Sequence, residues 1–319
     1  MTYSIVALDP ATGDLGVATQ SRFLAVGAVV PWARAGVGAV ATQAFANVRW
    51  GVDALDRLAA GDRTSVSAEA VLAELVAADE LRAERQVGIV DAYGGSATHT
   101  GPDCFAWAGG RTGPGFAAQG NILAGPGVVN ALVETFTAAG PAFPELLIAC
   151  LAAADEAGGD RRGRESAALL VVRADGGYGG GNDRWIDLRV DHADDPIGEL
   201  RRLLDLRHLY FDRPVEDDLV AIDEWTGAEL RSILEGLGAA PGGRFEAAFQ
   251  PMSGPRDDRA ESRPSVGEPR ELPPNWDARW QRALDDWMAV ENLEERSTAP
   301  GWIDQRVLAI LRDRSATRA

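Results

Sequence analysis

The chain has 319 residues, and all 31 of its positively charged side chains are arginines. The absence of lysine excludes Schiff-base catalysis, Ser-Lys dyads and a Walker A phosphate loop, because each of these needs a side-chain amine. A net charge of -17 disfavours nucleic-acid binding, and 46% hydrophobic residues over this length favour about two globular domains.

The cysteine content and the first residues limit the cellular compartments and the ligands that we expect for this protein. Cys104 and Cys150 are too few for a disulfide framework or a structural zinc site. The start MTYSIVALDP has neither a basic leader nor a long apolar core, and no stretch reaches the roughly 18 apolar residues of a membrane span. We therefore expect a cytoplasmic protein that uses no metal and no cofactor and binds neither membrane nor nucleic acid.

Residues 1–213 alternate between β-type and helical patterns. A hairpin is predicted first, with strands at 2–8 and 15–21. The segments that follow are strands at 28–32 and 37–43, helices at 52–60 and 67–78, strands at 86–91, 96–100 and 105–108 with a short one ending at 119, helices at 128–138 and 144–157, strands at 166–173 and 185–190, and a helix at 196–209. Strands in hairpins and helices in pairs predict an α+β fold of two stacked antiparallel sheets with helix pairs outside.

Residues 214–319 are predicted to form a separate small helical module. Its helical patterns lie at 229–237, 280–293 and 303–312. Between them, 251–274 is rich in Pro, Arg, Asp, Glu and Ser, which predicts a disordered insertion. Five of the nine tryptophans lie in this module, and we interpret them as its core rather than as a ligand-stacking surface.

Thr2 is the most informative residue of the chain. If Met1 is removed, Thr2 begins a strand and carries a hydroxyl and a free α-amine on adjacent carbons. An α-amine has a pKa of about 7.7–8.0, so it can accept the hydroxyl proton near neutral pH. This arrangement predicts an N-terminal nucleophile.

Longer motifs carry a resemblance to known proteins. The opening hairpin, with TYSIVA at 2–7 and GVATQSR at 16–22, resembles that of N-terminal nucleophile hydrolases such as proteasome β-subunits. Three further segments resemble the bacterial family called domain of unknown function 1028: SRFLAVGAVVPWARAGVGAVATQA at 21–44, QGNILAG at 119–125 and GGDRRGRESAALLVV at 158–172. The resemblance covers about residues 1–213 and implies a four-layer αββα sandwich.

The same resemblance implies roles for four residues. Thr2 corresponds to the nucleophile, and Ser21 and Arg22 correspond to polar residues that flank the proteasome site. Asp160 falls where an aspartate supports the N-terminal amine. The chain departs from that pattern at Gln20, which stands where an aspartate is expected.

A second departure concerns the base. The lysine that lowers the threonine pKa in those peptidases has no counterpart here, and Arg34 falls near its position. A guanidinium can stabilise an anion but cannot accept a proton, so the α-amine of Thr2 is the only base expected nearby.

Other polar residues are candidates for binding the substrate. Asn47, in the segment after the fourth strand, is either a side-chain donor of the oxyanion hole or a cap of the next helix. Arg22 and Arg34 either clamp a substrate carboxylate or form structural ion pairs. Gln43 and Asn121 complete the expected substrate-binding set.

The sequence therefore predicts an amidohydrolase that cleaves a small amide or peptide-like bond through Thr2, in a chain expected to form homo-oligomers. Two alternatives stay open. The missing lysine and Gln20 favour a non-catalytic binding or assembly protein of the same fold. Cys104, five residues after His99, allows thiol chemistry.

The end of the chain carries a second resemblance. Residues 217–249 and 284–313 resemble a peptidoglycan-binding-like domain that is often appended to this family. The residues themselves do not distinguish glycan binding from a docking or oligomerisation role.

Overall fold

A computed structural model describes residues 2–61, 66–138, 140–243 and 266–317. The chain divides into two compact units, Met1–Leu204 and Asp205–Ala319, which are described separately below. The division falls within helix α5 (Pro196–Phe211), whereas the sequence predicted a boundary just after this helix, at 213.

Six antiparallel strands form the first sheet of the first unit, in the order β10-β9-β2-β1-β8-β7. They are β1 (Thr2–Leu8), β2 (Leu15–Ser21), β7 (Gly109–Gly113), β8 (Phe116–Asn121), β9 (Ser166–Val172) and β10 (Arg184–Val190). The predicted hairpin of β1 and β2 is confirmed at its predicted bounds. Strand β1 is central, so Thr2 lies opposite both Ser21 and Asn121.

Four antiparallel strands form the second sheet, in the order β3-β4-β5-β6. They are β3 (Pro31–Arg34), β4 (Gly38–Ala44), β5 (Arg85–Asp91) and β6 (Ser96–Thr100). Gly36 has a φ of 69°, a left-handed conformation that glycine adopts without strain, and it allows the tight turn between β3 and β4. Strand β3 begins later than predicted because residues Val26–Ala28 form a 3-10 turn.

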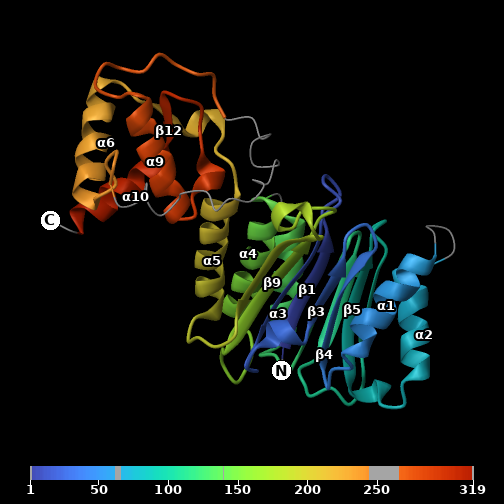
Figure 1. Cartoon of the computed structure of the whole chain (residues 1–319). Coiled ribbons are helices and arrows are strands. Elements are labelled where there is room, and N and C mark those ends of the chain that lie inside the picture. The colour runs from blue at the N-terminus through green and yellow to red at the C-terminus, as the bar shows by residue number, and fades with distance from the viewer. Residues whose placement is uncertain (1, 62–65, 139, 244–265, 318–319) are drawn as a thin grey trace. The chain divides into compact units, whose positions relative to one another are not determined.

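The predicted antiparallel sheets and helices are confirmed, and the helices of this unit occur in pairs along the chain (Figure 1). Helices α1 (Arg49–Ala60) and α2 (Ala68–Ala78) lie in the chain between β4 and β5 of the second sheet. Helices α3 (Pro126–Thr137) and α4 (Phe143–Glu156) lie between β8 and β9 of the first sheet. Helix α2 starts where the Ser67 hydroxyl accepts a hydrogen bond from the Ala70 amide at 3.2 Å, and α3 and α4 each carry proline in the first turn.

Three apolar clusters hold together the elements whose arrangement Figure 1 shows. One joins α3, α4 and the start of α5 to the first sheet through residues such as Tyr3, Leu147 and Leu200. A second joins α1 and α2 to the second sheet. The third contains residues of both sheets, including Val6 and Ala41. Alternate residues of β1 therefore belong to different clusters, which is why this strand is apolar almost throughout.

The predicted strand at 105–108 is wrong. The strand that pairs with β8 is Gly109–Gly113, whose sequence GGRTG carries no apolar alternation. The preceding aromatic-rich segment runs beside the end of β8 instead, where the carbonyls of Phe105 and Trp107 accept hydrogen bonds from the amides of Ile122 and Leu123. Phe105 is 75% exposed, so its apolar character does not mark a core position.

The second unit is a small helical module, as predicted, with one short antiparallel pairing between strands far apart in the sequence. Its elements are β11 (Leu219–Ala221), α6 (Glu224–Leu237), α9 (Ala278–Val290), β12 (Trp302–Asp304) and α10 (Gln305–Ala316), and β11 pairs with β12. Trp276, Trp280 and Trp287 lie in its apolar core, which agrees with the interpretation from sequence. Trp225 does not, because it is 68% exposed.

The predicted disordered insertion at 251–274 is tested only in part. Residues 251–265 lie outside the described part of the chain. Residues 266–274 are not a free linker: the Ala299 amide donates to the Val266 carbonyl at 2.9 Å, and the Arg270 amide donates to the Pro300 carbonyl at 3.0 Å. Backbone hydrogen bonding thus fixes a segment whose composition alone indicated disorder.

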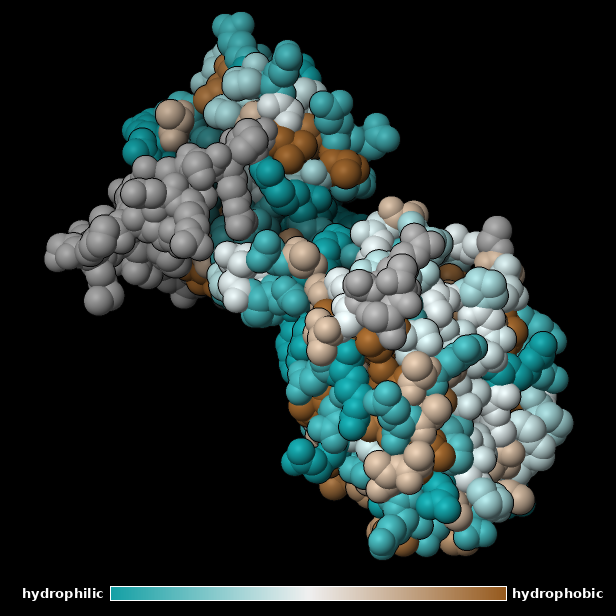
Figure 2. Space-filling view, turned by 90° about the vertical axis from the view of Figure 1, so that its right-hand side faces the viewer, coloured by the Kyte–Doolittle hydropathy of each residue, from teal (hydrophilic) through white to brown (hydrophobic). Residues whose placement is uncertain are grey.

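Figure 2 shows the face of the first unit that carries α1 and α2. Hydrophilic and neutral residues cover most of it, and apolar residues are scattered among them. Such a surface is typical of the solvated outer side of a helix pair.

Candidate active site around Thr2

Thr2 is placed at the start of the central strand, with its hydroxyl already oriented. Its Oγ1 donates a hydrogen bond to the Ser21 Oγ at 3.1 Å, and the same Ser21 oxygen accepts from the Phe23 amide at 3.1 Å. Thr2 shares the face of β1 with Ser4 and Val6, which is the face that meets the second sheet. The expected nucleophile and its expected neighbour Ser21 therefore lie together.

Asp160 joins this group through backbone amides. It is buried, and its carboxylate accepts hydrogen bonds from the amides of Arg22 at 3.0 Å and Arg162 at 2.8 Å. The Arg162 guanidinium lies 3.4 Å from the same carboxylate. Because Arg22 directly follows Ser21, Asp160 fixes the end of β2 where the Thr2 hydroxyl is bound.

Two side chains expected to bind substrate belong to a buried amide network. Gln43 Nε2 donates to the Thr2 carbonyl at 3.2 Å and to Gln86 Oε1 at 2.8 Å, and its Oε1 accepts from the Ser4 hydroxyl at 2.6 Å. Asn121 Nδ2 also donates to Gln86 Oε1, at 2.9 Å. The side chain of Gln43 therefore holds the Thr2 carbonyl and is not free to bind a substrate. Gln86, which was not among the residues predicted from sequence, accepts hydrogen bonds from both Gln43 and Asn121.

A cavity of about 550 Å³ opens beside these residues. It is lined by Ala44, Phe45, Glu84, Asp103, Cys104, Phe105, Asn121, Ile122 and Arg162. Asn121 connects it to Thr2, since the two residues are opposite each other in the sheet. Ala44 and Ile122 have φ values of 65° and 52°, which are uncommon for residues with a side chain and are found more often at functional sites.

One wall of this cavity is held by a buried ion pair. Arg85 Nε lies 3.1 Å from Asp79 Oδ2, and an Nη1 hydrogen bond from Arg85 holds the Phe45 carbonyl. Burial alone would raise the pKa of Asp79, but hydrogen bonds from Asn47 and Arg85 outweigh it and lower that pKa. The carboxylate therefore stays charged and keeps the Phe45 segment in place.

Asn47 forms hydrogen bonds both to the ion pair behind this wall and to the backbone at the start of α1. Its Nδ2 donates to Asp79 at 2.9 Å, and its Oδ1 accepts from the Arg49 amide at 3.2 Å as α1 begins. Asn47 therefore holds the backbone just before α1, whose N-cap position is Val48, and it is not among the residues that line the cavity.

The two arginines expected near the substrate both form ion pairs. Arg34 Nη2 lies 2.8 Å from Asp56 on α1 and is not among the cavity residues. Arg22 pairs with Glu165, whose pKa is lowered mainly by a hydrogen bond from His192. Arg162 lines the cavity instead. No residue spacing identified Arg162 as a site residue, because it reaches the site only through the turn after Asp160.

Cys104 lines the cavity but is poorly suited to nucleophilic chemistry. It is partly buried, and this burial raises the pKa of its thiol. The thiol donates to the Arg85 carbonyl at 3.4 Å, and His99 Nε2 lies 2.9 Å from the Arg82 carbonyl. A raised pKa leaves little thiolate at neutral pH, which weighs against the thiol alternative.

Gln20 provides a stability prediction. It is fully buried, and within the described ranges neither of its amide atoms has a hydrogen-bond partner. Replacing it by methionine, which has a similar shape, removes two unpaired polar atoms, so we expect the free energy of unfolding to rise by about 1–3 kcal/mol. Urea unfolding of Gln20→Met measures this; a destabilisation of the variant would contradict it.

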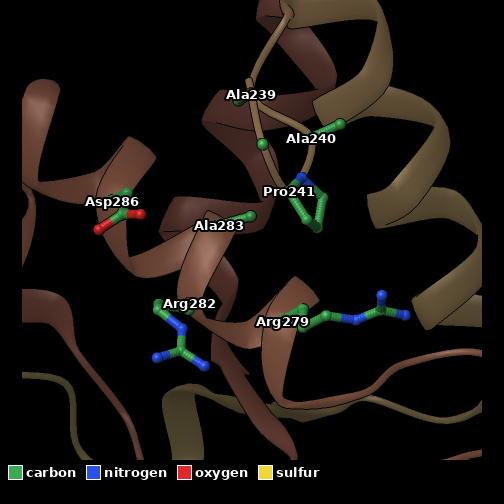
Figure 3. Close-up of a pocket in the computed structure, with 8 residues that line it drawn as sticks. Ala239, Ala240, Pro241, Arg279, Arg282, Ala283 and Asp286 are labelled. Atoms are coloured by element: carbon green, nitrogen blue, oxygen red, sulfur yellow. The ribbon is translucent and has the colours of Figure 1, made fainter. Parts of the chain in front are cut away.

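A separate cavity of about 520 Å³ lies within the second unit (Figure 3). Arg279, Arg282 and Asp286 from α9 border it, together with Pro241 from the segment after α6. Arg279 is held by Asp277, which its Nη2 approaches to 2.8 Å. The cavity is therefore bordered by two guanidinium groups, one of them already paired.

The described residues contain neither a cluster of metal ligands nor a membrane-spanning helix. Over residues 2–61, 66–138, 140–243 and 266–317, no group of three or more His, Cys, Asp or Glu side chains is arranged to hold a metal ion. Over the same ranges, no helix combines the length and the apolar character that crossing a bilayer requires.

Comparisons with known proteins agree with the division into two units. The chain is similar to protein SPO2555 from Silicibacter pomeroyi, whose crystal structure matches with a TM-score of 0.58 and 33% identity over 65% of this chain and 86% of that one. Residues 269–311 match the model called "Putative peptidoglycan binding domain", and no curated protein matches. Residues 2–200 match the model of a family of unknown function, DUF1028, and the chain belongs to that family.

Proposed function

We propose that this protein is an N-terminal nucleophile amidohydrolase that acts through Thr2 once Met1 is removed. The observation that carries the proposal is the Thr2 hydroxyl, hydrogen-bonded to Ser21 at the head of the central strand and one strand away from a cavity of about 550 Å³. Acyl transfer requires a nucleophilic hydroxyl, a side chain that orients it and a space for the substrate, and the Thr2 hydroxyl, Ser21 and the cavity supply these three.

In the proposed reaction the Thr2 Oγ1 attacks the amide carbonyl carbon and its proton passes to the α-amine of Thr2. Backbone N–H groups of the segment 44–47 stabilise the oxyanion, other than the Phe45 amide, which donates to the Glu84 carbonyl at 3.2 Å. The C–N bond then breaks, the amine returns the proton to the leaving nitrogen, and water hydrolyses the ester on Thr2. No lysine takes part, so the electrostatic help comes from Arg162 on the cavity wall.

The finer features of the fold belong to the same proposal. We infer that the three apolar clusters correspond to the interfaces of a four-layer αββα sandwich, the architecture of proteasome-like hydrolases. We place the protein in the cytoplasm and expect a small amide or peptide-like substrate. Assembly into a homo-oligomer is supported by Phe23 and Leu24, which are 56% and 60% exposed near the site.

Intact mass spectrometry of the full chain tests the proposal. The purified protein should lack Met1, and incubation with a β-lactone should add the mass of one probe molecule. Retained Met1 together with an unchanged mass after incubation would overturn it, because a blocked amine cannot act as the base.

The second candidate is a binding or assembly protein of the same fold without catalysis. Gln20 favours it, since this position carries no carboxylate and its amide lies buried away from the Thr2 face. In that case the cavity would bind its ligand unchanged. Retained Met1 in protein purified from its own host is the result that selects this candidate.

A further inference from the structure

We propose that Gln86 is a positioning residue for Thr2, acting across the two sheets through Gln43 and Asn121. This inference rests on the proposed function, and it assigns a role to a residue that touches neither the cavity nor the Thr2 hydroxyl. The evidence for this role is the position of Thr2 and Asn121 in the first sheet opposite Gln43 and Gln86 in the second.

The two pairs are matched by the registers of the two sheets. Thr2 and Asn121 lie opposite each other in β1 and β8, and Gln43 and Gln86 lie opposite each other in β4 and β5. Gln43 donates to the Thr2 carbonyl, and Asn121 donates to Gln86. Each member of one pair is therefore bound to a member of the other, which joins the sheets at the end where the nucleophile lies.

The hydrogen bonds around Gln86 fix which way its amide points. Its Nε2 donates to the Gly120 carbonyl at 2.8 Å and to the Thr100 hydroxyl at 2.9 Å. Its Oε1 must then face Gln43 and Asn121, whose amide nitrogens lie 2.8 Å and 2.9 Å away. With both acceptor sites of Gln86 used, the second N–H of Gln43 is directed at the Thr2 carbonyl.

The same network fixes Gln43 from its other side. Gln119 Nε2 donates to the Ser4 hydroxyl at 2.7 Å, and that hydroxyl donates to Gln43 Oε1 at 2.6 Å. Space for Gln119 depends on Gly88, because a Cβ atom at position 88 would lie 2.1 Å from Gln119 Oε1. The donors Gln119, Ser4 and Gln43 therefore follow one another in one direction to the Thr2 carbonyl, and the remaining N–H of Gln43 is held by Gln86.

Burial makes this arrangement rigid. Gln86 is fully buried, and Gln43 and Asn121 are nearly so. A buried amide that loses its partner bears a desolvation cost, so each bond in the network resists rotation of the others. Gln86 thus holds the peptide of Thr2 in one orientation relative to the cavity, which a nucleophile needs for an efficient attack.

The test is the rate of acylation of the full chain by a β-lactone, separated into the maximal rate (kinact) and the half-saturating probe concentration (KI). Gln86→Met removes the acceptor of Gln43 and should lower kinact about 10–100-fold while KI changes less than about twofold. Gln86→Glu keeps an acceptor oxygen for Gln43 and Asn121. It should therefore retain kinact within a few-fold even if it destabilises the fold.

Two further variants separate positioning from general stability. Gln43→Met should reduce kinact as Gln86→Met does, and the double variant should be no slower than the slower single one, because both act through one bond. Gln20→Met makes the same chemical change at a buried glutamine on the other face of the sheet, and it should leave kinact unchanged. If Gln86→Met does not fold, the contrast between Gln43→Met and Gln86→Glu decides.

The outcomes distinguish this inference from the proposed function. If the wild type forms an adduct at Thr2 but Gln86→Met reacts at the wild-type rate, or if kinact in all variants follows their stability, the positioning role is overturned and the proposed function stands. If the wild type forms no adduct at Thr2, both are overturned.

Discussion

Replacing Thr2 by alanine is expected to reduce the rate of acylation by a β-lactone by at least about 10⁴-fold, because the reacting oxygen is absent. The fold should survive, since the variant loses the hydrogen bond to Ser21, worth about 0.5–1.5 kcal/mol, and one buried methyl group, worth about 0.8 kcal/mol. Thr2→Ser keeps both the hydroxyl and the amine, so it should react within about tenfold of the wild-type rate. Intact mass spectrometry of samples quenched at successive times measures these rates for the wild type, Thr2→Ala and Thr2→Ser.

Cys104→Ala is the matched control for that experiment. Cys104 lines the same cavity, and burial raises the pKa of its thiol, so its removal should leave the acylation rate unchanged. Adducts that persist in Thr2→Ala and vanish in Cys104→Ala would show that the thiol is the reacting group.

Replacing Arg296 by alanine is expected to destabilise the second unit by about 3–5 kcal/mol. Its side chain is 2% exposed and lies 2.7 Å from Asp304, whose own side chain is fully buried. Arg296 also donates to the Asp212 carbonyl at 3.0 Å. Removing Arg296 leaves the buried Asp304 carboxylate without its cation. The same carboxylate caps α10, because its Oδ1 accepts hydrogen bonds from the amides of Arg306 and Val307.

Urea unfolding of the full chain, followed by the fluorescence of the buried tryptophans of this unit, measures that loss. Arg312→Ala is the control, because Arg312 pairs with Glu229 at 2.8 Å but is 47% exposed, and it should cost less than about 1 kcal/mol. Equal effects of the two substitutions would mean that the buried pair contributes no more than a surface pair.

The order of strands and helices could be predicted from sequence because each element carries its own pattern. Strand β1 is apolar on both faces, and α2 has a serine at its start and leucines at helical spacing, so neither depends on distant residues for recognition. Strand β7 was missed because GGRTG gains its β-structure only from pairing with β8.

The candidate site could be predicted only where it lies close to a motif. Thr2, Ser21 and Asp160 belong to segments that resemble known families, and the structure brings them into one region. Gln86 lies outside these segments and reaches the site through pairings between strands. Arg162 lies within the segment 158–172, but it reaches the cavity through the turn after Asp160, and the resemblance gave this residue no role. Arg34 looked suitable for its charge, but its ion pair with Asp56 holds it on α1.

The most direct test of the central claim is tandem mass spectrometry of peptides from the full chain after reaction with a β-lactone. We expect the probe on a peptide that begins at Thr2, attached to the threonine oxygen, with the α-amine free. A probe located on another residue, or acylated molecules that still carry Met1, would contradict the assignment of Thr2 as an N-terminal nucleophile.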